Sequence, residues 1–174
     1  NDWSTVRNAT VGSSATSSES GFNTGAGSSY KSGTTYFITR GFFYFDTSGL
    51  PDTASISSAT FSLYRYSYAY TSVSVQKGTQ GTGALSTSDY DAFTGSSYGN
   101  VAWASEYNDI ALNSTGRTDI NKTGDTFYCS REKTFDYDNN APDTEDGENG
   151  AYFSDYSGTT RDPKLYIEYT TSSS

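Results

Sequence analysis

The clearest pattern of hydrophobic and polar positions lies in residues 36–66, where two aromatic-rich runs flank a turn-forming segment, 46–53, that contains glycine and proline. Successive side chains of an extended strand point to opposite faces, so Ala59, Phe61 and Leu63 share one face of the second run. Polar and phenolic side chains occupy its other face. This alternation predicts two strands of one sheet in a two-sheet sandwich, with their apolar faces at the centre of the core.

Shorter alternating runs follow along the chain. Val73 and Val75 are expected to point inward from one strand, and the segments 125–132 and 164–170 have the same period of two. Residues 89–91 are expected to form a short helical turn. Roughly eight to ten short strands separated by Gly, Asp and Ser turns predict an all-β fold, a jelly-roll-like two-sheet antiparallel β-sandwich.

The N-terminal third is less regular. Residues 1–11 are interpreted as a strand with mixed faces, and residues 12–33 are rich in Ser, Gly and Thr. We therefore divide the chain into an N-terminal segment, 1–33, and a β-sandwich domain, 34–174. Two roles remain open for the N-terminal strand: it completes its own sandwich, or it pairs with a neighbouring subunit by strand donation.

The composition predicts the cellular compartment. Aliphatic residues are scarce, and 16 Tyr and 10 Phe supply the area that the core must bury. Low Lys, high Ser, Thr, Gly and Tyr and a net charge of -9 predict an extracellular or cell-surface protein. The acidic balance indicates no nucleic-acid partner, and we expect no membrane insertion. The single cysteine, Cys129, is interpreted as a buried, inert thiol.

The residues available for chemistry argue against an enzyme. The chain has no histidine and one cysteine, so neither a Cys–His pair nor a Ser–His–Asp triad can form. No motif positions a general acid beside a general base, although acidic residues are common. We therefore predict no enzymatic activity.

The acidic run 136–148 is the best candidate for an ion site, because carboxylate and amide oxygens are the ligands that Ca²⁺ prefers. Its spacing is not that of an EF-hand loop, so a solvated acidic loop is the alternative. The candidate calcium ligands are Asp136, Asp138, Asn140, Asp143, Asp146 and Glu148.

Three N-glycosylation sequons begin at Asn8, Asn113 and Asn121. Because Ser and Thr are so abundant, about three such matches are expected by chance under the motif's definition. Covalent glycans are therefore predicted from the compartment rather than from the motifs.

A tyrosine ladder, LYRYSYAY, occupies residues 63–70. Tyrosine rings pack beneath neighbouring segments, join proteins at interfaces and stack on sugars, and all three interpretations remain open here. The candidate residues for self-association are Trp3, Val6, Val11, Tyr64, Tyr66 and Tyr68.

Several runs carry a family resemblance. They are 40–46 (RGFFYFD), 49–51 (GLP), 56–64 (ISSATFSLY), 107–116 (YNDIALNSTG) and 162–165 (DPKL). Together they resemble the DNRLRE-type β-sandwich domain of large bacterial and archaeal surface proteins, which is related to alginate-binding carbohydrate modules. The resemblance implies a jelly-roll fold and a cell-surface setting, and it implies no catalytic residue. The N-terminal third and the acidic run depart from the family pattern, so no binding face is carried over.

These observations predict a non-enzymatic extracellular structural protein. It would self-associate head to tail into a surface fibre, filament or adhesin stalk, with strand donation as one route, and would carry glycans. A carbohydrate-binding module is the alternative, with Ca²⁺ needed to bridge an acidic polysaccharide. A phage tail-fibre or receptor-binding module is a further alternative and would form a trimer.

Overall fold

The computed structural model describes residues 2–17, 25–69, 71–143 and 147–171. The strands are β1 (Ser28–Ser32), β2 (Thr35–Thr39), β3 (Gly41–Asp46), β4 (Ser55–Ala69), β5 (Ser72–Gly78), β6 (Phe93–Ala102), β7 (Tyr107–Ala111), β8 (Asp125–Glu132), β9 (Asn149–Ala151) and β10 (Lys164–Thr170). The short helical segments are α1 (Trp3–Arg7), η1 (Thr87–Asp91), α2 (Ser114–Thr118) and η2 (Lys133–Tyr137).

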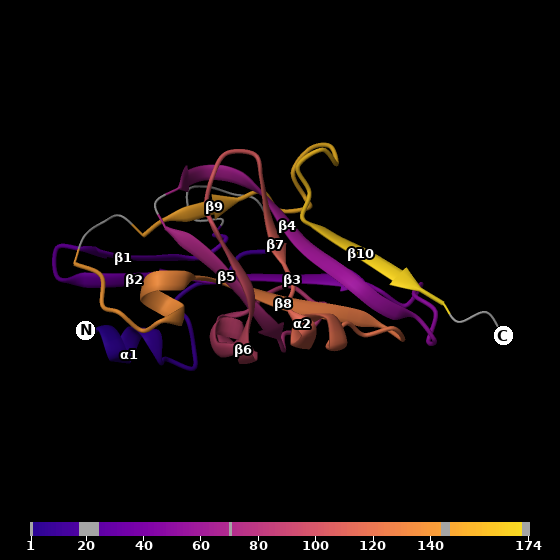
Figure 1. The fold of residues 1–174 in the computed structure, drawn as a ribbon. Coiled ribbons are helices and arrows are strands. Elements are labelled where there is room, and N and C mark those ends of the chain that lie inside the picture. The colour runs from indigo at the N-terminus through magenta and orange to yellow at the C-terminus, as the bar shows by residue number, and fades with distance from the viewer. Residues whose placement is uncertain (1, 18–24, 70, 144–146, 172–174) are drawn as a thin grey trace.

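The strands form two antiparallel sheets that pack face to face (Figure 1). One sheet has the order β10-β4-β7, and β9 pairs with a later part of β4; the other has the order β3-β8-β5-β6. Strands β1 and β2 form a separate hairpin. The chain crosses repeatedly from one sheet to the other, as in a jelly roll. The predicted all-β sandwich is confirmed.

The core lies between the two sheets. Ala59, Phe61 and Leu63 of β4 and Val73 and Val75 of β5 are buried, as their alternation predicts. Rings from both sheets meet here, because β3 and β8 each contribute an aromatic residue to the cluster around β4. Aromatic side chains thus supply much of the buried area in a chain with few aliphatic residues.

The two aromatic-rich runs of residues 36–66 do not share a sheet, which corrects the prediction. β3 pairs with β8, whereas β4 pairs with β10 and β7, so the two runs face each other across the core. The first run also divides into β2 and β3 at Arg40, whose guanidinium is buried in ion pairs. Alternation identifies the inward face of a strand but does not identify its sheet.

The N-terminal residues form helix α1 and not the predicted strand. The side chain of Asp2 caps the helix by accepting a hydrogen bond from the amide of Thr5. Trp3 is buried, packs edge-on against Tyr36 of β2 and donates from its indole nitrogen to Asn139 Oδ1. The N-terminus is therefore docked on its own domain. The proposed boundary between residues 33 and 34 lies in the turn of the β1–β2 hairpin.

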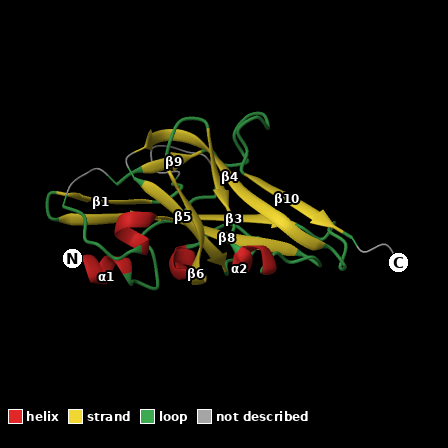
Figure 2. Ribbon diagram, in the orientation of Figure 1, coloured by secondary structure: helices red, strands yellow, loops and turns green. Residues whose placement is uncertain are grey.

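The helical segments gather on one side of the molecule, below the strands in Figure 2. η2 contacts both β5 and β8 on that side. β8 is consequently covered on both faces: Tyr128 packs in the core, and Cys129, which points the opposite way, is also fully buried. Cys129 is a free thiol, as predicted, and its burial raises the pKa of the thiol to about 12.

Candidate functional site

A buried cluster of charged side chains joins η2 to the sheet above it. Arg40 donates from Nε and Nη2 to the two carboxylate oxygens of Asp136, both at 2.8 Å. Arg131 of β8 donates to the same oxygens from Nε at 2.9 Å and Nη2 at 2.6 Å. A third arginine, Arg7 of α1, donates to the main-chain oxygen of Asp136 at 2.6 Å. Asp136, through its carboxylate and its main-chain oxygen, thus connects three segments that are distant in sequence.

The local sequence turns Asp136 inward. Glu132 is fully buried and caps η2, because its carboxylate accepts hydrogen bonds from the amides of Thr134 at 2.8 Å and Asp136 at 3.2 Å, and from that of Phe135. Burial raises the pKa of Glu132, although these amide hydrogen bonds act in the opposite direction. The capped turn fixes the backbone from which Asp136 meets the two arginines.

Aromatic rings cover the guanidinium groups. The Arg40 guanidinium carbon lies 4.1 Å from the ring centre of Tyr90 and 4.8 Å from that of Phe93, and Arg131 lies 4.4 Å from the Phe93 ring. Arg40 also donates to the main-chain oxygens of Tyr90 and Arg7. Burial raises the pKa of the Tyr90 hydroxyl to about 12. The cluster is therefore a structural anchor, since its charged groups are paired with one another and with main-chain oxygens inside the protein.

The cluster should make stability depend on acidity. Burial alone would raise the pKa of Asp136, but Arg40 and Arg131 outweigh it and lower this pKa to about 2 from 3.8. A lowered folded-state pKa stabilises the protein above the unfolded value, and this stabilisation is lost as pH falls toward 2. We expect the difference in unfolding free energy between wild type and Asp136→Asn to be constant above about pH 5 and to shrink by about 2 kcal/mol by pH 2. Urea titrations of both proteins across this range would measure it; a difference that does not change with pH would contradict it.

Among the residues that the structure describes, the predicted calcium ligands do not group as a metal site. Asp136 is turned inward and is occupied by arginines, while the Asp138 carboxylate pairs with Lys133 at 2.5 Å. The amide nitrogen of Asn140 donates to Thr134 O. Asp143 is exposed, Glu148 lies beyond the gap at residues 144–146, and Asp146 is outside the described residues. Within the described ranges no three His, Cys, Asp or Glu side chains group as a metal site.

The three sequon asparagines are all exposed. Asn8 ends α1 and its side-chain oxygen accepts a hydrogen bond from Arg7, while Asn113 caps α2 through Gly116 N. The amide nitrogen of Asn113 donates to Ser97 O at 3.0 Å, and that of Asn121 donates to Asp125 O at 3.3 Å. Glycosylation replaces one of the two hydrogens on Nδ2, so at these two positions the remaining hydrogen would have to serve the existing hydrogen bond.

The described tyrosines of the ladder, Tyr64 and Tyr66, contact other rings of their own chain. Tyr64 meets the rings of Tyr107 and Tyr152, and Tyr66 meets Tyr152 at 5.0 Å between ring centres. Arg161 covers part of this group, with its guanidinium carbon 4.9 Å from the Tyr152 ring centre. The side chain of Tyr68 lies outside the described part of the chain. Of the other self-association candidates, Trp3 is buried, Val6 is half-buried and Val11 is exposed.

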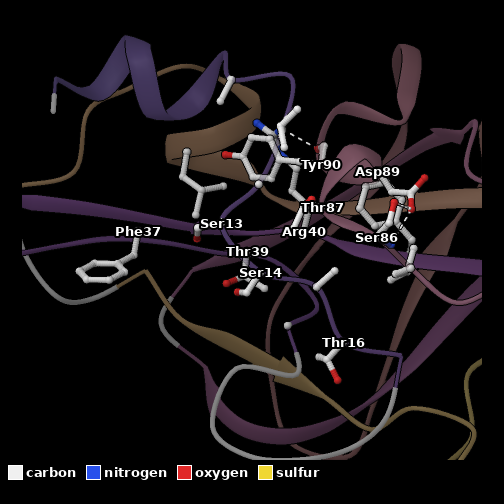
Figure 3. A pocket seen from close by; sticks show the side chains of 18 of the residues that line it. Ser13, Ser14, Thr16, Phe37, Thr39, Arg40, Ser86, Thr87, Asp89 and Tyr90 are labelled. Carbon is white, nitrogen blue, oxygen red and sulfur yellow. Dashed lines mark hydrogen bonds between the residues drawn. The ribbon is translucent and has the colours of Figure 1, made fainter.

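A cleft of about 520 Å³ opens next to the charged cluster (Figure 3). Its walls are the residues that follow α1, strand β2 with Arg40, and the loop that leads into η1. The side chains in the close-up are mainly hydroxyl-bearing or apolar, and Figure 3 labels Ser13, Ser14, Thr16, Phe37, Thr39, Arg40, Ser86, Thr87, Asp89 and Tyr90. The cleft was missed in the sequence because its walls come from three separate segments.

Strand β10 forms an edge of its sheet. It pairs only with β4 among the described residues, in a register that places Leu165 and Ile167 beside the core residues of β4. Tyr166 points away from the core and is 63% exposed, and Tyr169, after a bulge in the strand, is 43% exposed. These are two of the most exposed large side chains of the described surface, and they share one strand.

No relative identifies this chain. The scan of protein-family models finds no match, and the searches of curated proteins and of solved structures find none either. No helix in the described ranges has the length and apolar character needed to cross a membrane. The resemblance to DNRLRE-type domains stays a prediction, and what the chain does has to be inferred from its own surface.

Proposed function

We propose that the protein is a non-enzymatic extracellular structural subunit that self-associates through the free edge of β10. The observation that carries this proposal is an edge strand that pairs on one side and presents Tyr166 and Tyr169 to solvent. Unpaired backbone amides and carbonyls form a template for another strand. Soluble proteins usually blunt such edges with charge, proline or a covering segment. Here Lys164 begins the strand and a bulge follows Glu168, so residues 165–167 themselves carry neither a charge nor a proline.

The partner is a second copy, because the chain also offers a complementary edge. β3 ends the other sheet and carries Tyr44, which is 50% exposed. If β10 pairs antiparallel with β3 of a neighbour so that Tyr166 lies opposite Tyr44, then Lys164 lies opposite Asp46. The core-facing residues of both strands then meet on the other face. Two different edges make a heterologous contact, which repeats into an open filament.

The rest of the chain is compatible with this role. The composition led us to expect a surface protein, and the asparagines of the three sequons are exposed. The docked α1 helix argues for edge pairing in preference to donation of an N-terminal strand.

Two lysines on the edge should weaken assembly. We expect Tyr166→Lys combined with Tyr169→Lys to remain monomeric at concentrations at which the wild type forms oligomers, because charge on an edge strand repels an incoming strand. Size-exclusion chromatography with light scattering measures the mass of each species. Tyr66→Lys is the matched control, since Tyr66 is 41% exposed but lies in the later part of β4, which pairs with β9 and not with β10. Equal masses for wild type and double variant would contradict the proposal.

A further inference from the structure

The cleft beside Arg40 has walls that hold each other in place. The amide of Gly12 donates to Thr87 O at 2.7 Å, and the amide of Leu85 donates to Ser17 Oγ at 2.7 Å. The hydroxyl of Tyr90 donates to Val6 O at 3.0 Å. Helix α1 and the segment after it are therefore tied to η1 and the loop that leads into it at three points. With a volume of about 520 Å³ the cleft falls within the usual range of small-molecule sites, about 300–1,000 Å³.

The charges in the cleft already have partners. Arg40 is ion-paired with Asp136 and donates to two main-chain oxygens, so it does not offer an uncompensated cation. The carboxylate of Asp89 accepts hydrogen bonds from the amide and hydroxyl of Ser86 at 2.8 and 2.9 Å through Oδ2. Charged ligands gain most from an unpaired opposite charge. The cleft consequently favours an uncharged ligand.

The remaining lining suits a molecule with an apolar face and a rim of hydroxyls. Phe37 is 42% exposed, and its ring is backed by Tyr30, which stacks on it nearly parallel with ring centres 4.9 Å apart. Phe37 thus offers a flat apolar ring at one end of the cleft (Figure 3), supported from outside the lining by Tyr30. Hydroxyl groups can both donate and accept, which matches the hydroxyls of a ligand. The hydroxyl-bearing side chains along the cleft include Ser13, Ser14, Thr16, Thr39, Ser86 and Thr87.

We infer that this cleft binds a short neutral oligosaccharide. A sugar ring would stack on Phe37 through its apolar face, and its hydroxyls would bond to the serine and threonine hydroxyls and to the Asp89 carboxylate. The site lies away from the β10 edge and does not depend on self-association.

The test is calorimetric titration of the full chain with four neutral trisaccharides, maltotriose, cellotriose, mannotriose and chitotriose, and with a guluronate trisaccharide as the acidic probe. We expect saturable binding of at least one neutral probe and none of the acidic one. Phe37→Ala should weaken that binding about tenfold, because a ring contact of this kind contributes about one decade in affinity. Ser14→Trp should abolish it by filling the cleft from an exposed position.

Tyr66→Ala is the matched control, since it removes a ring that is 41% exposed, close to the 42% of Phe37, from a part of β4 outside the cleft, and it should leave binding unchanged. Thermal unfolding establishes that each variant is folded, and if Ser14→Trp is not, Phe37→Ala decides alone. The inference is overturned if no neutral probe saturates, if the acidic probe is the one bound, or if Phe37→Ala binds as the wild type does. Binding to a monomeric Tyr166→Lys, Tyr169→Lys protein separates this site from assembly.

Discussion

Replacing Asp136 with asparagine is expected to lower the free energy of unfolding by about 3–5 kcal/mol, the usual cost of removing one partner from a buried ion pair. Both oxygens of this carboxylate are hydrogen-bonded to arginines whose side chains are almost fully buried. Without the negative charge, Arg40 and Arg131 would remain buried next to each other, and Arg7 lies close by. Neither guanidinium can lose its proton to escape the cost.

Chemical denaturation of Asp136→Asn at neutral pH measures this effect, and Asp138→Asn is the matched control. Asp138 also pairs with a cation, Lys133, but both side chains are partly exposed, so its loss should cost about 0–1 kcal/mol. Equal losses for the two variants would mean that the buried cluster does not anchor η2 to the sheet.

Gly27→Ala is expected to be among the most damaging single changes of a small residue. A Cβ at this position would lie 2.3 Å from the backbone nitrogen of Glu132 and 2.5 Å from the carbonyl carbon of Arg131. Its φ of +136° is also one that alanine rarely adopts. Because the obstacle is strand backbone, β1 or β8 must move, and we expect a loss above about 4 kcal/mol or failure to fold.

Two other glycines separate the two causes. Gly33→Ala places alanine at φ +59° in open space and should cost about 1–2 kcal/mol for the backbone conformation alone. At Gly49 an added Cβ also meets open space, and the backbone does not have a positive φ, so Gly49→Ala should be close to neutral. Urea unfolding measures the loss of stability in all three variants. Circular dichroism shows whether Gly27→Ala folds at all. A cost for Gly27→Ala no larger than that for Gly33→Ala would show that β1 does not approach β8 so closely.

Asp136 and Gly27 lie in the same part of the fold. Gly27 lies against the residues of β8 from which Arg131 and Glu132 project, and those two side chains hold Asp136 and η2. The close approach of one glycine thus brings the β1–β2 hairpin next to the charged anchor. Damage to either should loosen α1, which is docked on β2 and on the residues that follow η2.

Alternation in the sequence predicted the strands well where one face is apolar and the other polar. Ala59, Phe61 and Leu63 and the valines of β5 point inward as expected, because a period of two is a local property that packing between sheets preserves. The short helical turn at residues 89–91 was also confirmed, within η1. A single side-chain cap at Ser86 and Asp89 is enough to specify such a turn.

The missed features depend on partners far away in the chain. The N-terminal residues lack a clear period, and the helix there is fixed by the local cap at Asp2 and by the burial of Trp3 under residues from elsewhere. The charged cluster did leave a signal. Arg40 and Arg131 are charged residues inside otherwise apolar or strand-like runs, and a charge in such a run is buried only with a partner. The identity of that partner, Asp136, follows only from the fold.

The most direct test of the central claim, that β10 of one molecule pairs with β3 of the next, is a mixing experiment with two variants that each add one cysteine, Tyr44→Cys and Tyr166→Cys. Opposed residues in neighbouring strands have Cβ atoms about 4.5–5.5 Å apart, close enough for a disulfide after small shifts. The native Cys129 is fully buried and should not compete. We expect a disulfide-linked dimer when the two variants are mixed and oxidised, and much less from either variant alone. Equal cross-linking in all three samples, or none in the mixture, would contradict the account.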